Sequence, residues 1–185
     1  MAHARTPRSS WITQGLEVLA AGGVDAVRVE PIAARLGVTK GGFYGYFSGR
    51  EQLLAEMLSV WEKEVTAGVI AAVESSRSRD ARERVQRLAQ AIDDPDRVTM
   101  RVDTEVAMRE WARRDPAAAE VVARVDQQRT AYLRSLFGEF CSPEEADART
   151  AIAVSVRLTS YFMDLGHPGR SHQEVIALVV RDLLR

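Results

Sequence analysis

The sequence contains very little cysteine and no long apolar run. Cys141 is the single cysteine among 185 residues, so no disulfide can form within the chain, and this fits a reducing cytoplasm. No stretch approaches the roughly 18 uninterrupted apolar residues that a membrane-spanning helix requires. The opening residues, MAHARTPRSS, lack the apolar centre of a secretory signal. These absences predict a cytoplasmic protein that makes no membrane contact.

Sequence motifs for catalysis and cofactor binding are also missing. There is no nucleotide-binding glycine loop, no Gly-x-Ser-x-Gly elbow and no His-Glu-x-x-His. His167 and His172 lie in a loop-like segment without a carboxylate or thiolate at ligand spacing, so solvation explains them better than a metal does. Asp103, Glu105 and Glu110 point around a helix, and solvation accounts for them as well. We therefore expect no enzyme activity, no cofactor and no metal.

The net charge of −1 hides an uneven distribution along the chain. Residues 1–50 carry six basic groups against three acidic ones, a balance of +3, and the remaining residues hold 19 basic and 23 acidic groups, a balance of −4. The basic groups of the N-terminal segment are Arg5, Arg8, Arg28, Arg35, Lys40 and Arg50. The N-terminal segment alone is therefore suited to face a polyanion.

Apolar residues recur at helical spacing along the whole chain, without strand alternation or hairpin turns, so the sequence predicts an all-α fold. Ser10 is expected to cap the first helix, and the run from Asp93 to Asp96 is expected to end one helix and cap the next. The later helices are expected at 50–61, 82–92, 98–114, 117–140, 143–165 and 171–184.

Residues 28–47, RVEPIAARLGVTKGGFYGYF, read as two short helices joined by a tight turn. Ile32, Ala33 and Leu36 form the apolar stripe of the first helix. Gly37 follows at the point where the chain reverses, and a reversal there needs a positive φ that glycine adopts without a Cβ penalty. The pattern is that of a helix-turn-helix, whose second helix enters the major groove of DNA.

The second helix has an apolar inner face and a small, polar outer face. Phe43 and Phe47, four residues apart, supply the inner face. The outer face consists of Thr39, Lys40, Gly41, Gly42 and Tyr44. Thr39 is placed to cap the helix. With Gly45 as well, few side chains are left to read bases, so specificity is expected to depend on close backbone approach and on DNA shape.

From Ser10 to Trp61 the sequence resembles the N-terminal DNA-binding domain of the TetR family of one-component transcriptional regulators. The segments that carry the resemblance are WITQGLEVLAAGG, the two helices of 28–47 and FYGYFSGREQLL. The resemblance implies a DNA-binding domain over 1–49, with an N-terminal arm and three helices, and a helical effector-binding and dimerisation domain over 50–185. The arm, residues 1–9 with Arg5 and Arg8, is expected either to lie along the phosphate backbone or to be a frayed terminus. It also implies that TKGGFYGYF is the recognition helix and that the Tyr44 hydroxyl contacts the DNA backbone.

The residues expected to contact DNA are Arg28, Thr39, Lys40, Gly41, Tyr44, Tyr46 and Arg50. The Lys40 ammonium can reach guanine O6 and N7 or a phosphate. Arg50 opens the next helix and adds cationic charge to amides disposed to bind phosphate. Arg28 stands where many members of the family have a capping threonine, and it can still meet a phosphate.

Seven residues are expected to line a pocket for an apolar or amphipathic effector: Trp61, Met100, Thr104, Met108, Trp111, Tyr132 and Phe162. Methionine, tryptophan and a few hydroxyls are typical of adaptable apolar cavities, and the resemblance implies an effector pocket in the second domain. The same spacing is more often that of an ordinary core.

The last two helices are too apolar around their circumference for a surface pair. Val175, Val179 and Leu183 occupy a different arc from Leu178 and Leu184, so one arc can face the core and the other a second copy of the chain. These arcs predict a homodimer. Together with the resemblance to the TetR family, they imply a homodimeric repressor that binds a near-palindromic DNA operator and is released by a small effector. The competing interpretation is a helical interaction module whose helix-turn-helix contacts protein instead of DNA.

Overall fold

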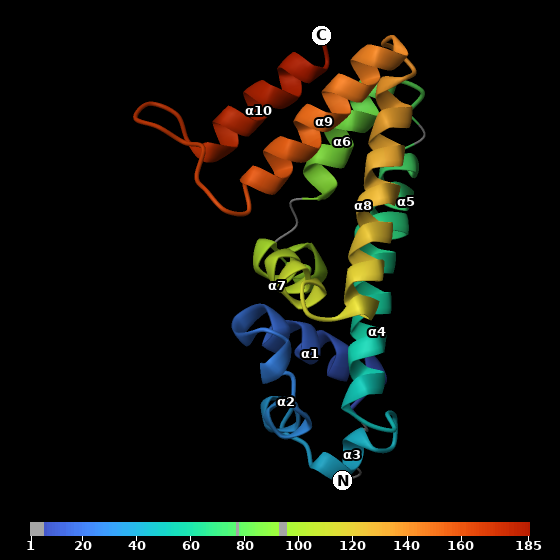
Figure 1. Ribbon diagram of the computed structural model, residues 1–185, viewed down its shortest axis with the longest axis vertical. Coiled ribbons are helices and arrows are strands. Elements are labelled where there is room, and N and C mark those ends of the chain that lie inside the picture. Colours follow the sequence, from blue (N-terminus) through green and yellow to red (C-terminus); the bar gives the residue numbers. More distant parts are fainter. Residues whose placement is uncertain (1–5, 77, 93–95) are drawn as a thin grey trace. The chain divides into compact units, whose positions relative to one another are not determined.

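The computed structural model describes residues 6–76, 78–92 and 96–185, and every regular element in these ranges is a helix (Figure 1). Among these residues, the one β-type backbone pairing is an isolated bridge between His167 and Arg170. The all-α prediction is confirmed. Most of the run expected to cap a helix around Pro95 lies outside the described residues.

The chain divides into two compact units, which we call unit 1 (residues 1–65 and 94–124) and unit 2 (residues 66–93 and 125–185). The helices within unit 1 are α1 (Arg8–Gly22), α2 (Val29–Arg35), α3 (Lys40–Phe43), α4 (Arg50–Lys63) and α7 (Val102–Ala112). Those within unit 2 are α5 (Val69–Glu74), α6 (Ala81–Ala91), α9 (Pro143–Thr159) and α10 (His172–Leu183). Helix α8 (Pro116–Phe137) and a π-helical turn (Glu64–Gly68) each run from unit 1 into unit 2. The division into functional domains at residue 49 stays a prediction.

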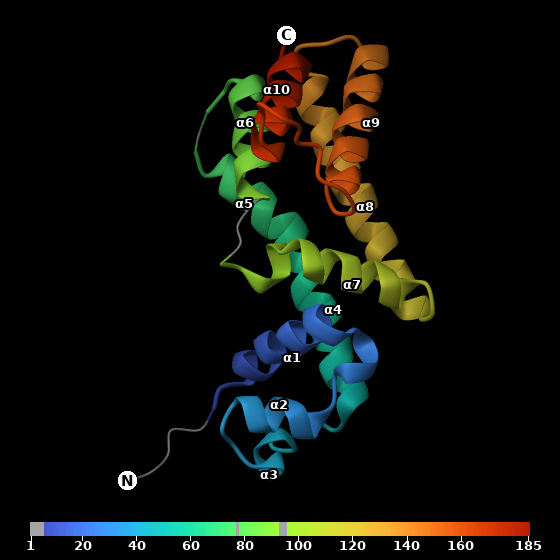
Figure 2. The ribbon, with the colours of Figure 1, turned by 90° about the vertical axis from the view of Figure 1, so that its left-hand side faces the viewer.

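Helix α1 is the centre of unit 1 and packs against α2, α4 and α7 (Figure 2). Trp11 and Leu19 of α1 and Trp61 of α4 are completely buried. The approach to α4 is close at Gly15, where a Cβ would lie 2.7 Å from the Met57 sulfur. The first helix therefore serves as the support on which the helix-turn-helix rests.

Helix α1 begins earlier than the expected cap at Ser10. Pro7 is the N-cap residue, and its carbonyl oxygen already accepts a hydrogen bond from the Ser10 amide at 3.1 Å. The Arg8 guanidinium pairs with Glu56 of α4 and lies over the Phe47 ring, 4.9 Å from its centroid. These contacts fix the additional residues of α1 against the body of unit 1.

The helix expected over 98–114 is interrupted at Arg101, which is extended (φ −70°, ψ 146°) between the 3₁₀ turn Val98–Met100 and α7. The cause is an ion-pair cluster, because the Arg101 guanidinium binds Asp103 and donates to Glu17 of α1 at 2.9 Å. The expectation that Glu105 is solvated is wrong. Glu105 is 3% exposed, and its carboxylate accepts from Arg109 at 2.8 Å.

In unit 2, α9 and α10 form an antiparallel pair whose N-termini are closed by capping boxes. The Ser142 hydroxyl accepts from the Glu145 amide, and the Ser171 hydroxyl accepts from the Glu174 amide. Helix α9 ends at Thr159 instead of the expected residue 165, because tight turns follow in which the Phe162 amide bonds back to the Thr159 carbonyl at 2.9 Å. One buried hydrophobic cluster of unit 2 consists of Val85, Leu136, Phe137, Ala146, Leu183 and Leu184.

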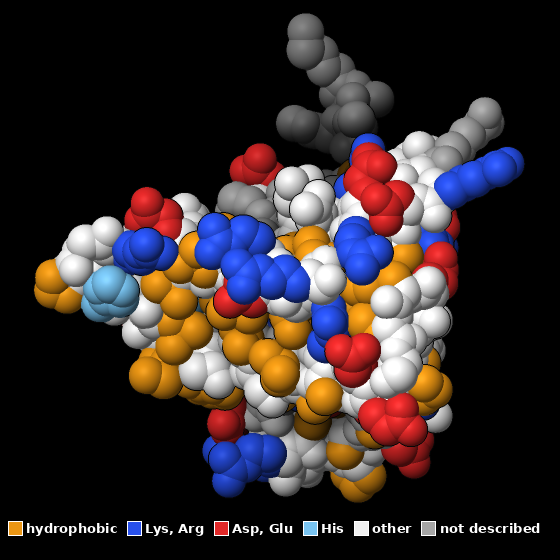
Figure 3. All heavy atoms as spheres, turned by 90° about the horizontal axis from the view of Figure 1, so that it is seen from above, with side chains coloured by type: hydrophobic (Ala, Val, Ile, Leu, Met, Phe, Trp, Pro, Cys, Tyr) orange, Lys and Arg blue, Asp and Glu red, His pale blue; other side chains and the backbone are white. Residues whose placement is uncertain are grey.

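Helices α9 and α10 bury few of their own apolar side chains within unit 2. Among the described residues, only Ala146 and Thr150 of α9 and Leu183 of α10 are buried. Ile152 of α9 is 49% exposed. Exposed hydrophobic side chains gather at this end of unit 2 when the molecule of Figure 1 is seen from above (Figure 3).

Candidate nucleic-acid interface

The reversal between α2 and α3 has the geometry of a helix-turn-helix. Gly37 has φ +67°, as the sequence predicted. The amides of Gly37 and Val38 bond back to the carbonyls of Ala34 at 3.1 Å and Ala33 at 3.0 Å, which ends α2. Thr39 then occupies the N-cap position of α3 in extended geometry, although its side chain makes no capping hydrogen bond.

Aromatic packing fixes the inner face of α3. Phe43 and Phe47 are 0% and 2% exposed, and their rings are stacked with centroids 4.9 Å apart. The Trp11 ring of α1 meets the Phe43 ring edge to face at 5.4 Å. Regular helix ends at Phe43, earlier than the predicted end at residue 47, and a turn with Gly45 follows. Glycine has low helix propensity, which accounts for the early end.

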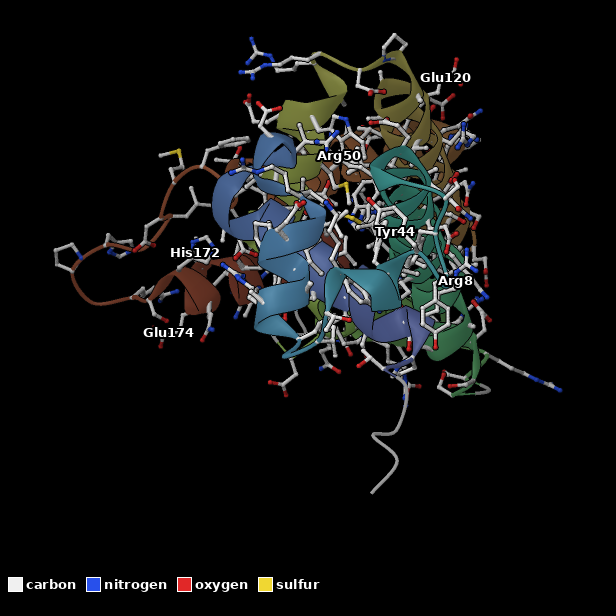
Figure 4. The ribbon with its side chains drawn as sticks, turned by 90° about the horizontal axis from the view of Figure 1, so that it is seen from below. Arg8, Tyr44, Arg50, Glu120, His172 and Glu174 are labelled. Atoms are coloured by element: carbon white, nitrogen blue, oxygen red, sulfur yellow. The ribbon has the colours of Figure 1, made fainter. Side chains whose placement is uncertain are left out.

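The opposite face of α3 is exposed and carries the small and polar residues that the sequence placed there. Thr39, Lys40, Gly41, Gly42 and Tyr44 are all exposed. The Tyr44 side chain is 55% exposed, and its ring lies edge to face on Phe43 at 5.3 Å. A Cβ added at Gly41 would meet only the Thr39 hydroxyl, at 3.8 Å, so packing does not require glycine at this position. Figure 4 views this end of unit 1 and labels Tyr44 and Arg50.

Arg50 has an internal role that the sequence did not reveal. Its Nε donates to the Val27 carbonyl at 2.6 Å, and its Nη2 donates to the Val24 carbonyl at 2.7 Å. These bonds tie the segment before α2 to the first residue of α4. Arg50 is therefore a positioning residue for the helix-turn-helix, and only part of its guanidinium is left to face DNA.

The carboxylate of Glu30 interacts with two basic residues, Lys40 and Arg28. The Lys40 ammonium pairs with Glu30, which is in the first turn of α2. This hydrogen bond lowers the pKa of Glu30, and the charge of Arg28 lowers it further. The Glu30 carboxylate in turn raises the pKa of Lys40. Arg28 itself is the exposed N-cap residue of α2 and forms no capping hydrogen bond through its side chain.

Two other expected contacts have a different setting. Tyr46 is half-buried, with its ring 6.5 Å from the Phe47 ring. Arg8, expected in a loose arm along the phosphate backbone, is instead the first residue of α1 and pairs with Glu56. Arg5, its neighbour in the expected arm, lies outside the described residues.

The seven residues expected to line an effector pocket fall into both units. Trp61, Met100, Thr104, Met108 and Trp111 belong to unit 1, where all five are buried. Tyr132 and Phe162 belong to unit 2. Tyr132 is half-buried and donates to Glu74 at 2.6 Å, whereas Phe162 is 70% exposed. The Thr104 hydroxyl is buried without a hydrogen-bond partner among the described residues.

The described part of the chain contains no group of three or more His, Cys, Asp or Glu that could hold a metal ion. His172, considered above as a ligand, uses its Nδ1 to accept from the Leu165 amide at 3.0 Å. Among the same residues, no helix is long and apolar enough to cross a membrane.

Comparison with known proteins identifies the N-terminal segment. Residues 12–57 match the family described as bacterial regulatory proteins, tetR family. The match covers most of α1, all of α2 and α3 and the first half of α4, and it therefore includes the turn at Gly37 and the exposed face of α3. No curated protein sequence matches the chain significantly.

Solved structures share the fold over nearly the whole chain. A transcriptional regulator from Rhodococcus sp. Rha1 has a TM-score of 0.73 and 18% identity, over 96% of this chain and 94% of its own. A ketosteroid transcriptional regulator of Mycobacterium tuberculosis has a TM-score of 0.67 and 17% identity, over 98% and 96%. A TetR/AcrR-family regulator from Thermobifida fusca has a TM-score of 0.63 and 21% identity, over 96% of each chain. At these identities the likeness establishes the fold alone.

Proposed function

Because the chain belongs to the TetR family of bacterial regulatory proteins and is a DNA-binding transcription regulator, we propose that it acts as a dimeric repressor. In this proposal, one α3 of each protomer enters the major groove at each half of a near-palindromic operator. A small apolar or amphipathic effector releases the protein from DNA. Such a regulator is not an enzyme, and it works in the cytoplasm, where its operator lies.

The observation that carries the proposal is the two-sided character of α3. On one side, the Phe43 ring packs against the Trp11 and Phe47 rings. On the other side, Lys40 and Tyr44 are exposed to solvent, and no bulky side chain lies near Gly41. A helix this short has little stability of its own, so its conformation depends on these buried rings. An exposed face held this firmly is suited to a rigid partner such as a DNA groove.

Each exposed residue has a distinct role in the proposed complex. Lys40 contacts a base or a phosphate, Tyr44 donates its hydroxyl to a phosphate, and Gly41 allows the backbone to approach the groove closely. Thr39, Arg28 and Tyr46 lie at the margin of this surface, where they contact the DNA backbone. Arg50 keeps α4 and α2 in register and offers its remaining N–H groups to a phosphate.

Dimerisation is proposed through α9 and α10. The support is that this helix pair buries very few of its apolar side chains within unit 2, and Ile152 is half exposed. Contact of two such pairs would form a four-helix bundle with two-fold symmetry. Two-fold symmetry places two recognition helices on one DNA face, which is the basis for the near-palindromic operator.

The effector is proposed to bind in the helical region that follows the DNA-binding segment. Thr104, Met108 and Trp111 of α7 share one face of that helix, and the unpartnered Thr104 hydroxyl is a polar group available to an amphipathic molecule. Release from DNA requires that the effector bind the two conformations with different affinity, with a coupling of about 1–3 kcal/mol.

Selection of genomic fragments by the purified protein, followed by electrophoretic shift, tests the proposal. A dimeric repressor should enrich fragments with an inverted repeat, and two chains should bind each repeat. The competing function, a helical module whose helix-turn-helix contacts protein, predicts no enriched fragment.

A further inference from the structure

Glu30 is the acidic residue that pairs with the cation at the start of α3. Its carboxylate pairs with the Lys40 ammonium, and the charge of Arg28 stabilises the same carboxylate. The Glu30 and Lys40 side chains are 63% and 51% exposed, so the pair is reached by solvent and by any ligand at this surface. The Glu30 carboxylate therefore already binds the Lys40 ammonium, which is the group that the proposed function assigns to DNA contact.

We propose that Glu30 is a specificity-determining residue, whose carboxylate competes with DNA phosphate for the Lys40 ammonium and so suppresses binding to unmatched DNA. The proposal rests on the DNA-binding function proposed above, and it adds a residue outside the contact set predicted from the sequence. Glu30 works from α2, although the contact it controls belongs to α3.

The chemistry of the two anions makes the competition direct. A carboxylate and a phosphate both offer anionic oxygens, and an ammonium on a flexible four-carbon chain can exchange between them. Exposed ion pairs of this kind are weak, so exchange is readily reversible. A Lys40–Glu30 pair that stays closed on DNA is neutral and releases no counterion, and the Glu30 charge also repels nearby phosphates.

A matched operator changes this balance. At the operator, contact of the Lys40 ammonium with guanine O6 and N7 compensates for the loss of its ion pair with Glu30. At an unmatched site, the ammonium can exchange Glu30 only for a phosphate. The carboxylate therefore lowers affinity for unmatched DNA more than affinity for the operator. Removal of the carboxylate should raise both affinities and reduce the ratio between them.

Glu51 provides a matched control in unit 1. It is in the first turn of α4, its side chain is 87% exposed, and its carboxylate lies 3.3 Å from Arg50 Nη1. The other donors of that guanidinium are fixed on Val24 and Val27. Glu51→Gln thus removes the same charge as Glu30→Gln but leaves its cationic partner anchored.

The experiment measures affinity of the full chain for a short mixed-sequence DNA duplex as a function of salt. The variants are Glu30→Gln, Lys40→Gln, the double variant and Glu51→Gln, with Glu30→Ala as a second removal that favours helix. We expect Glu30→Gln to raise affinity several-fold at low salt and to steepen the log–log slope by about 0.9 per bound chain. In the Lys40→Gln background the same change should leave the slope unaltered, and Glu51→Gln should not reproduce the gain.

The inference would be overturned if Glu30→Gln changed DNA affinity equally in the wild-type and Lys40→Gln backgrounds, or if Glu30→Gln and Glu51→Gln had equal salt slopes. In either case, DNA binding by the wild type would leave the proposed function intact. Absence of any wild-type binding at low salt would instead refute both. Once an operator has been selected, Glu30→Gln should also lower the ratio of operator affinity to mixed-sequence affinity, and an unchanged ratio would contradict the assignment.

Discussion

The Nε of Arg50 donates a hydrogen bond of 2.6 Å to the carbonyl oxygen of Val27, joining the first residue of α4 to the segment that precedes α2. A second bond of 2.7 Å reaches Val24. The two bonds hold the helix-turn-helix against α4 through one side chain.

Arg50→Ala should therefore destabilise the protein as well as weaken DNA binding. Loss of hydrogen bonds from a charged donor should lower the free energy of unfolding by about 1.5–3 kcal/mol. Chemical denaturation measures this change, with Arg35→Ala as the control because Arg35 is an exposed arginine at the end of α2. If Arg50→Ala weakened DNA binding without any loss of stability, Arg50 would be a phosphate contact alone.

The buried pair of Glu105 and Arg109 predicts a second stability effect. Arg109→Ala would leave a carboxylate that is 4% exposed without its cationic partner. We expect a loss of about 1–3 kcal/mol, below the 3–5 kcal/mol typical of fully buried pairs because the Arg109 side chain is 22% exposed. Arg113→Ala on the same helix breaks a pair whose side chains are 76% and 56% exposed, and it should change stability by less than about 0.5 kcal/mol. Equal effects in thermal or chemical unfolding would contradict the assignment.

Gly41 separates the requirements of DNA contact from those of the fold. A Cβ has room inside the protein at this position, so Gly41→Val should leave the melting temperature unchanged or raise it slightly. It should nevertheless abolish operator binding, since a branched side chain prevents close approach to the groove. Gly37→Ala is the opposite control, because its φ of +67° strains any other residue and should lower stability. Normal operator binding by Gly41→Val would show that this face does not lie against DNA.

The unpartnered hydroxyl of Thr104 distinguishes a pocket from an ordinary core. Removal of a buried hydroxyl without a partner should stabilise the protein by about 1 kcal/mol, and Thr104→Val keeps the volume of the side chain. Thr150→Val is the matched control, since the Thr150 hydroxyl of α9 is buried in the same way. With a panel of amphipathic small molecules, only Thr104→Val should reduce ligand-induced release of the operator. Unaltered release in Thr104→Val would assign this residue to the core.

The local features of the helix-turn-helix were predictable because they depend on residues close together in sequence. The positive φ at Gly37 follows from the need to reverse the chain, and the burial of Phe43 and Phe47 follows from their spacing of four. The start of α4 at Arg50 was also predicted correctly. The lengths of helices were less predictable, as the early end of α3 shows.

Features that depend on distant partners were missed. The break at Arg101 is stabilised by Glu17, a residue 84 positions away, and the first turn of α1 is held by Glu56 through Arg8. Neither ion pair produces a periodic pattern in the sequence from which it could be predicted. The pairing of Glu30 with Lys40 spans only ten positions, but it depends on how the turn brings α2 and α3 together. Helical periodicity therefore finds the apolar faces, while ion pairs between helices require the three-dimensional arrangement.

The most direct test of the account compares wild type with Lys40→Ala and Tyr44→Phe on a fragment selected from genomic DNA. Tyr44→Phe retains the ring that packs on Phe43 and removes only the hydroxyl. The account predicts that wild type binds as two chains per inverted repeat, with affinity that falls by roughly 0.9 log units per log unit of salt for each phosphate neutralised. Each substitution should cost about 1–3 kcal/mol, and only Lys40→Ala should reduce discrimination at one operator position. A salt slope near zero, or unaltered binding by both variants, would contradict the assignment of the exposed face of α3 to DNA.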